Sequence, residues 1–195
     1  MDVRIFSKCN FTLVGLREIF SRVPALHVKS ANRFTLIPQG RKKCIFIIDG
    51  ASEGFEEYYA SIKCHFYDIV SVFIIINNSN HEPVCIDEKT VLIPKSTPIG
   101  YFSNILNIEE IHESGAAQPV KLSKSEHAVF RYWSEGYSPE VIAERVGINK
   151  KSVLNSKARL LNKYGVHDKN SLLLIATILF KRQIIKLGEG SANAP

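Results

Sequence analysis

The stretch SPEVIAERVGINKKSVLNSKARLLNKYG, residues 138–165, decides how the second half of this chain folds. It begins with a serine that can cap a helix, followed by a proline, which is tolerated at the first helical position. Gly147 can close this short helix, and Asn149 can cap a longer helix predicted over 150–163. Two helices joined by so short a glycine-containing turn predict a helix-turn-helix.

Two further helices flank this motif. Ser123 and Glu126 have the spacing of a capping box, which predicts a helix that ends at Gly136. Asp168 can cap a last helix over about 169–186. One stripe of the helix over 150–163 and the residue after it is expected to face the domain core; it holds Val153, Leu160 and Tyr164. Trp133, in the helix that ends at Gly136, is also expected in the core.

About residues 121–178 resemble the LuxR/NarL–FixJ type of helix-turn-helix found in bacterial transcription factors. The match is specific because many positions agree at fixed spacing. They are Leu122, Ser123, Glu126, Val129, Gly136, Ser138, Ile142, Ala143, Val146, Gly147, Ile148, Lys151, Ser152, Val153, Asn155, Lys163, Gly165 and Val166.

The resemblance implies that the third helix enters the DNA major groove, where base edges can be distinguished. It implies base contacts from Leu154, Asn155 and Ala158. Basic residues of the same helix are expected to meet phosphates, and these are Lys150, Lys151, Lys157, Arg159 and Lys163. It also implies a two-fold dimer through the last helix, for which we expect Leu172, Leu173, Ala176 and Leu179.

The first 110 residues alternate strand and helix patterns, which favours a doubly wound parallel α/β sheet. Apolar runs that read as strands lie at 3–6, 44–48, 70–76 and 91–93. Helices are expected from the stripe Leu13, Leu16, Phe20 and Val23, ended by Pro24, and over 55–64 and 99–108.

This order, with one strand ending in Asp49 and a later strand ending in Lys95, resembles the receiver domain of response regulators. The resemblance places Asp49 at the phosphoryl-acceptor position and Lys95 at the position of the sensing lysine. Ser7 and Lys8 stand where the family has the acidic pair that binds Mg²⁺. Phosphoryl transfer needs a divalent cation, and Mg²⁺ needs carboxylate ligands. We therefore expect a pseudo-receiver in which Lys8 and Lys95 flank Asp49 in place of the metal.

Charge is divided unevenly along the chain. The net charge is +6, yet residues 1–120 hold 12 basic and 13 acidic residues, whereas 121–195 hold 13 and 6. A basic domain favours a nucleic-acid partner. The expected domains are a receiver-like domain at 1–110, a linker at 111–120, the LuxR-type helix-turn-helix domain at 121–187 and a disordered tail at 188–195.

Enzymatic function, metal binding and membrane insertion are not expected. The four cysteines, Cys9, Cys44, Cys64 and Cys85, have no metal-ligand spacing and are expected to be buried and reduced. No catalytic triad, cofactor motif or secretory signal is recognisable. No apolar run approaches the roughly 20 residues of a spanning helix, so we expect a cytoplasmic protein without cofactors.

The leading interpretation is a DNA-binding transcriptional regulator whose receiver-like domain works without phosphorylation, in dimerisation or partner binding. It resembles the enterobacterial auxiliary regulators of capsule or surface genes that pair with a full response regulator. Double-stranded DNA and either a second copy or another response regulator are the expected partners. Two alternatives remain: a phosphorylation-dependent regulator that uses Asp49, and an antagonist that sequesters another regulator.

Overall fold

A computed structural model describes residues 2–21, 27–30, 43–64, 68–77, 83–104 and 119–188, and the chain divides into two compact units, Met1–Pro119 and Val120–Pro195. The linker expected at 111–120 and the tail expected at 188–195 fall almost wholly outside the described residues. So do Val23, Pro24 and the last four residues of the helix expected over 99–108.

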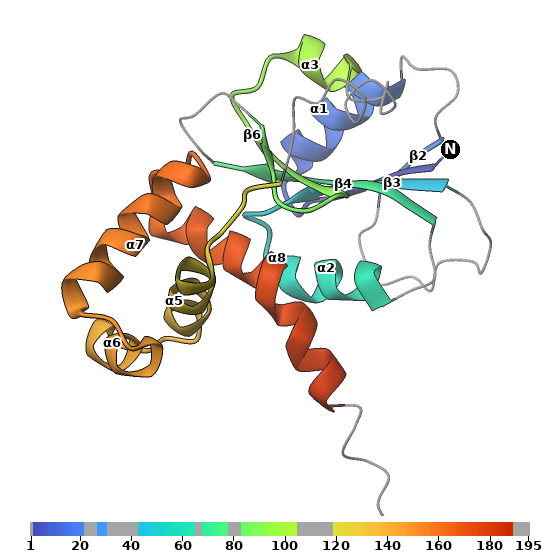
Figure 1. Ribbon diagram of the computed structural model, residues 1–195. Helices are drawn as coiled ribbons and strands as arrows, with labels where there is room; N and C mark the ends of the chain where they lie inside the picture. Colours follow the sequence, from blue (N-terminus) through green and yellow to red (C-terminus); the bar gives the residue numbers. More distant parts are fainter. Residues whose placement is uncertain are drawn as a thin grey trace, which may run out of the picture. The chain divides into compact units, whose positions relative to one another are not determined.

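The first unit is built on a six-stranded sheet in the order β2-β1-β3-β4-β6-β5 (Figure 1). All pairings are parallel except that of β5 with β6. The doubly wound α/β fold is thereby confirmed. The strands are β1 (Asp2–Phe6), β2 (His27–Ser30), β3 (Lys43–Asp49), β4 (Asp68–Ile76), β5 (Val84–Cys85) and β6 (Thr90–Pro94).

The two outermost strands, β2 and β5, were not predicted. Strand β2 has the sequence HVKS and β5 has only two residues. Edge strands pair on one side alone, so they lack the continuous apolar run of a strand buried on both faces. The signal that identified β3 and β4 is therefore missing at both edges.

Helices α1 (Asn10–Ser21) and α3 (Ile99–Asn104) cover one face of the sheet, and α2 (Phe55–Cys64) covers the other (Figure 1). The stripe Leu13, Leu16 and Phe20 of α1 is buried as expected, in one cluster with alternate residues of the strands. On the opposite face, the ring of Tyr58 from α2 stacks on Phe6 at 4.2 Å between centroids.

Parallel strands bring their carboxyl ends to one edge of the sheet, where open α/β folds place their sites. Ser7 follows β1, Asp49 ends β3 and Lys95 follows β6. These three residues, far apart in sequence, therefore meet at the same edge.

The second unit consists of α5 (Lys124–Ser134), α6 (Pro139–Val146), α7 (Lys150–Lys163) and α8 (Lys169–Gly188). The predicted caps are confirmed: Ser138 accepts from the Val141 N–H, and Asn149 Oδ1 accepts from the Ser152 N–H at 2.7 Å. Gly147 ends α6 with a φ of +72°, a left-handed conformation that favours glycine. The short turn between α6 and α7 follows from it.

The core of this unit joins all four helices. Val153, Leu160 and Tyr164 of α7 are buried, as predicted from their spacing. The Phe130 ring of α5 meets the ring of Tyr164 at 5.9 Å and that of Phe180 at 5.4 Å. Ring contacts thus tie α5 to the end of α7 and to α8. Trp133 is half-buried against the same core.

Two expectations about the chain's chemistry can be compared with the structure. Cys44 and Cys85 are buried, but Cys9 is exposed, so the prediction of buried thiols is wrong for Cys9; the Cys64 side chain lies outside the described ones. Within the described ranges, no helix combines the length and apolar character needed to cross a membrane.

Candidate functional site

The receiver-like pocket is centred on a buried carboxylate. Asp49 is 3% exposed and its two oxygens are shared among three donors. The Ser7 hydroxyl donates to Oδ2 at 2.8 Å, the Ala51 N–H donates to Oδ1 at 3.2 Å, and the Lys95 ammonium lies 3.6 Å from Oδ1. The structure therefore brings Ser7, Asp49 and Lys95 together.

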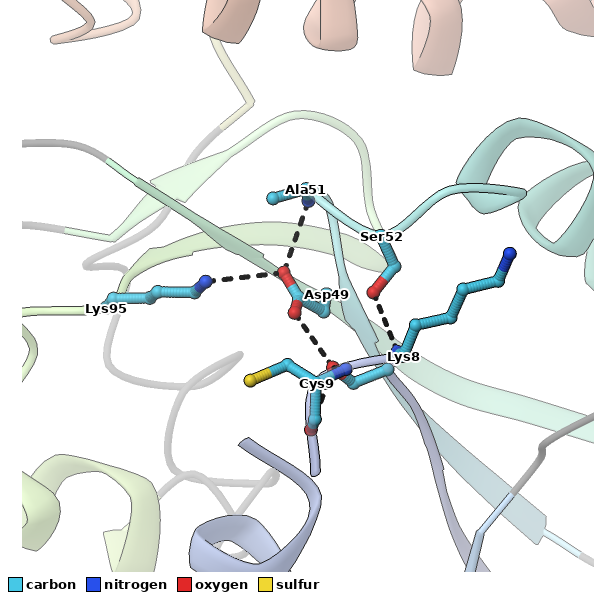
Figure 2. Close-up of polar contacts among 7 residues, drawn as sticks. Lys8, Cys9, Asp49, Ala51, Ser52 and Lys95 are labelled. Carbon is cyan, nitrogen blue, oxygen red and sulfur yellow. Dashed lines mark hydrogen bonds and ion pairs between the residues drawn. The ribbon is translucent and has the colours of Figure 1, made fainter. Parts of the chain in front are cut away.

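Lys8 departs from the expectation that its ammonium faces Asp49. Its Nζ instead forms an ion pair with Glu53 at 2.6 Å, and its side chain extends away from Asp49 (Figure 2). Past the end of β1, the Lys8 backbone N–H donates to the Ser52 hydroxyl at 3.0 Å, which places Lys8 beside Glu53. Hydrogen bonding to Lys8 lowers the pKa of the Glu53 carboxyl. Among the described residues, Lys95 alone supplies a positive charge to Asp49.

This donor set has a chemical consequence. In the place of a carboxylate, Ser7 offers a hydroxyl that already donates to Asp49. Mg²⁺ binding favours several hard anionic oxygens, and the described side chains that contact Asp49 include no second carboxylate. No group of three or more metal-ligating side chains occurs in the parts of the chain that the structure describes. Among the described residues, the Asp49 carboxylate is held by the Ser7 hydroxyl, the Ala51 N–H and the Lys95 ammonium.

Helix α7 has one buried and one exposed side. Val153, Ser156 and Leu160 are buried. The residues with expected base contacts, Leu154, Asn155 and Ala158, all lie on the exposed side, and Leu154 is 48% exposed.

The five cations expected to meet phosphates are in different situations. Lys151 and Arg159 are exposed, and neither has an ion pair within the described side chains. Lys150 pairs with Glu140, and both are exposed; its hydrogen bond lowers the Glu140 pKa to about 2. Lys157 lies over the Trp133 ring at 5.2 Å, and burial lowers its pKa. It lies at the margin of the exposed face.

Lys163, which is expected to meet a phosphate, has partners within the unit. Its ammonium donates to Glu126 Oε2 at 2.7 Å and to the Lys121 carbonyl at 3.1 Å. Glu126 also accepts from the Ser123 N–H at 2.8 Å, completing the predicted capping box. The Glu126 side chain is only 8% exposed, so the ammonium is needed there as its counter-charge. The spacing that revealed the cap gave no signal for this ion pair.

The dimer residues expected on α8 also need correction. Leu172 and Ala176 are each 1% exposed, so they are not available to a second chain, and their assignment to a dimer surface is wrong. Leu173 and Leu179 are half-buried. The helix is apolar around most of its circumference, and sequence alone did not separate its core side from its outer side.

The structure exposes three large apolar side chains of the first unit that the sequence reasoning missed. Phe11 and Val14 of α1 are 91% and 66% exposed, and Ile99 of α3 is 68% exposed. Helices α1 and α3 contact each other. We call Phe11, Val14 and Ile99 the α1–α3 surface. Its signal was present in the sequence, because Phe11 and Val14 are apolar residues outside the buried stripe of α1.

The fold and these sites define a receiver-type domain joined to a helix-turn-helix domain. Residues 120–176 match the luxR family of bacterial regulatory proteins.

The whole chain is similar to two proteins named transcriptional regulatory protein RcsA. The one from Erwinia amylovora is 24% identical over 190 residues, covering 87% of this chain and 90% of its own. The one from Pantoea stewartii subsp. stewartii is 23% identical with the same coverage.

Two solved structures share the fold. An RcsB–DNA complex of a two-component response regulator has a TM-score of 0.50 at 18% identity. A structure of two RcsB dimers bound to two parallel DNAs has a TM-score of 0.51 at 16% identity. Each covers 92% of this chain and 98% of its own.

The Glu126–Lys163 pair predicts a stability effect. Replacing Lys163 by Ala leaves a buried carboxylate without its counter-charge, and because the lysine side is partly open to water, the unfolding free energy of the second unit should fall by about 1–2 kcal/mol. The single tryptophan, Trp133, lies in this unit, so its fluorescence during urea unfolding reports the change. Lys151→Ala is the matched control and should shift stability by less than about 0.5 kcal/mol.

The same pair predicts a pH dependence. The hydrogen bond from Lys163 lowers the pKa of Glu126 below its ordinary value of 4.5. Because the folded-state pKa is depressed, the pair's contribution is complete above pH 4.5 and is lost as the pH falls through the folded value. The difference in unfolding free energy between the native protein and Lys163→Ala should therefore become smaller in acid. Unchanged stability at pH 7 together with weaker DNA binding would restore Lys163 to the phosphate contacts.

Proposed function

We propose that this protein is a DNA-binding transcriptional regulator that reads the major groove with α7. The observation that carries the proposal is the exposed side of α7, where Asn155, Leu154 and Ala158 are flanked by the cations Lys151 and Arg159. A helix-turn-helix presents such a face to base edges, while flanking cations meet phosphates. The match of residues 120–176 to the luxR family supports it, as does the name of the RcsA relatives.

The receiver-like domain is proposed to act without phosphorylation. Both Asp49 oxygens already have donors, and the partners at the strand ends are a hydroxyl and an ammonium. An incoming phosphoryl group would have to displace Lys95 or Ser7, without the carboxylates that normally hold Mg²⁺. The domain then keeps the receiver fold as a scaffold.

The proposed role of that scaffold is dimerisation of the chain through the α1–α3 surface. Large apolar side chains this exposed favour a protein contact. A two-fold dimer would bring two copies of α7 to two half-sites, which matches the way helix-turn-helix dimers engage DNA. Leu173 of α8, in the second unit, is a half-buried apolar residue available to a separate contact between copies. The alternative is that another response regulator binds this surface and forms a heterodimer.

DNA binding predicts a specific salt dependence. Each lost phosphate contact should reduce the slope of log affinity against log salt by about 1, so Lys151→Ala and Arg159→Ala should each do so. Fluorescence anisotropy with duplex DNA over a salt series measures it. Lys8→Ala, an exposed cation of the other unit, is the control. A flat salt dependence, unaffected by Lys151→Ala or Arg159→Ala, would favour the antagonist interpretation instead.

Independence from phosphorylation predicts that acetyl phosphate and Mg²⁺ add no mass to the protein. Asp49→Asn should then bind DNA as tightly as the native chain, since both lack a phosphoryl group. Intact-mass spectrometry and the same anisotropy assay check the two statements, with circular dichroism confirming the fold of the variant. A mass increase that Asp49→Asn abolishes would establish the phosphorylation-dependent alternative.

Dimerisation predicts that Phe11→Ser weakens self-association by tenfold or more, because burying a phenylalanine is worth about 1.5–3 kcal/mol. Sedimentation velocity over a concentration series measures the dissociation constant. Lys89→Ser, an exposed residue away from α1, should leave it unchanged. A native chain that stays monomeric at all concentrations would contradict the homodimer and favour the heterodimer.

A further inference from the structure

Leu154 is unusual among the exposed residues of the second unit. Of the large apolar side chains that the structure describes there, it is the one recorded as exposed, at 48%. Single exposed apolar residues are common on protein surfaces. The position of this one matters, because it lies in the amino-terminal half of the helix proposed to enter the groove.

The neighbours of Leu154 define what its face can recognise. Ala158 lies one turn further on the same side, and both are exposed, so the two form a short apolar strip. Asn155 is exposed beside them and carries a donor and an acceptor. None of these three positions holds Arg or Lys, the residues that most often read guanine through its O6 and N7 atoms.

The chemistry of the major groove offers one apolar feature to such a strip. Thymine carries a 5-methyl group there, whereas unmodified cytosine presents an amino donor and no methyl. Adenine offers an acceptor and a donor that match an asparagine side chain. A cytosine methylated at C5 would present the same methyl as thymine at that place.

The helix is fixed well enough for this reading. Asn149 caps its first turn, Val153 and Leu160 anchor its inner side in the core, and Lys163 ties its last turn to Glu126. Because these contacts fix the rotation of α7 about its axis, Leu154 and Ala158 stay on its outer side. Cations of the same helix, Lys151 and Arg159, are placed to hold phosphates beside it.

We propose that Leu154 and Ala158 read 5-methyl groups of pyrimidines in the major groove, so that the protein selects thymine, with Asn155 on an adenine, at the centre of each half-site. This inference rests on the proposed DNA-binding function and adds the class of base that the site accepts. Loss of one buried methyl corresponds to about 0.8 kcal/mol, or a fourfold change in affinity.

The test begins with selection of bound sequences from a random duplex library by the full-length chain. In the selected site, each thymine is then replaced singly by deoxyuridine, which removes only the methyl. The native chain should lose about fourfold at one or two positions per half-site. Leu154→Ala should bind less tightly and lose this sensitivity at the position that Leu154 contacts, whereas Leu154→Met should keep it.

Two controls separate the methyl contact from general affinity. Lys151→Ala should weaken binding to every duplex and keep the deoxyuridine effect, because it touches phosphate. At the base that Leu154 contacts, replacing thymine by cytosine should weaken binding of the native chain, and replacing it by 5-methylcytosine should weaken binding less, because the methyl group is kept. Circular dichroism confirms that the exposed substitutions leave the fold intact.

The outcomes are distinct. Salt-dependent binding with no deoxyuridine effect, an effect that persists in Leu154→Ala, or selection of unmethylated G·C pairs at the half-site centre would each overturn the methyl-reading proposal while the DNA-binding function stands. Failure to bind any duplex would overturn the DNA-binding function and the inference together.

Discussion

Within the second unit, the way α5 meets α7 depends on one buried carboxylate. Glu126 accepts from the Ser123 N–H at the start of α5 and from Lys163 at the end of α7. A carboxylate this buried is tolerable only with such partners, so it forces the first turn of α5 and the last turn of α7 together. Since the core fixes the inner side of α7, this tie at the end of the helix determines which of its residues face outward.

Asp49 follows the same physical rule in the other unit, with a different result. Its carboxylate is as buried as that of Glu126, and it is satisfied by Ser7, the Ala51 N–H and Lys95. The sheet brings these groups together because parallel strands end at one edge. The fold of a receiver can therefore persist while its metal-binding carboxylates are replaced, since the electrostatic requirement of the buried Asp49 is met by the chain itself.

Local patterns made much of this structure predictable. Helix α2 spans Phe55–Cys64 as expected, and the caps at Ser123, Ser138 and Asn149 lie where serine and asparagine suggested, because each depends on three or four successive residues. The sites were predicted less well, because they depend on residues distant in sequence. The partner of Lys163 lies 37 residues away in the sequence and that of Lys8 lies 45 residues away. The periodic patterns of helices and strands relate residues only a few positions apart, so they do not predict such pairs.

The structure also changes the meaning of the basic charge on the second half of the chain. Lys163 is committed to Glu126, Lys150 pairs with Glu140, and Lys157 lies over Trp133. On α7, Lys151 and Arg159 are then the cations without an ion pair among the described side chains, and the proposed DNA contact would use them first. Each phosphate contact contributes about one unit to the salt slope, so these two cations by themselves would give a single α7 only a weak electrostatic hold on a duplex. Two copies on adjacent half-sites double that hold, which gives the proposed dimer a physical reason independent of its apolar surface.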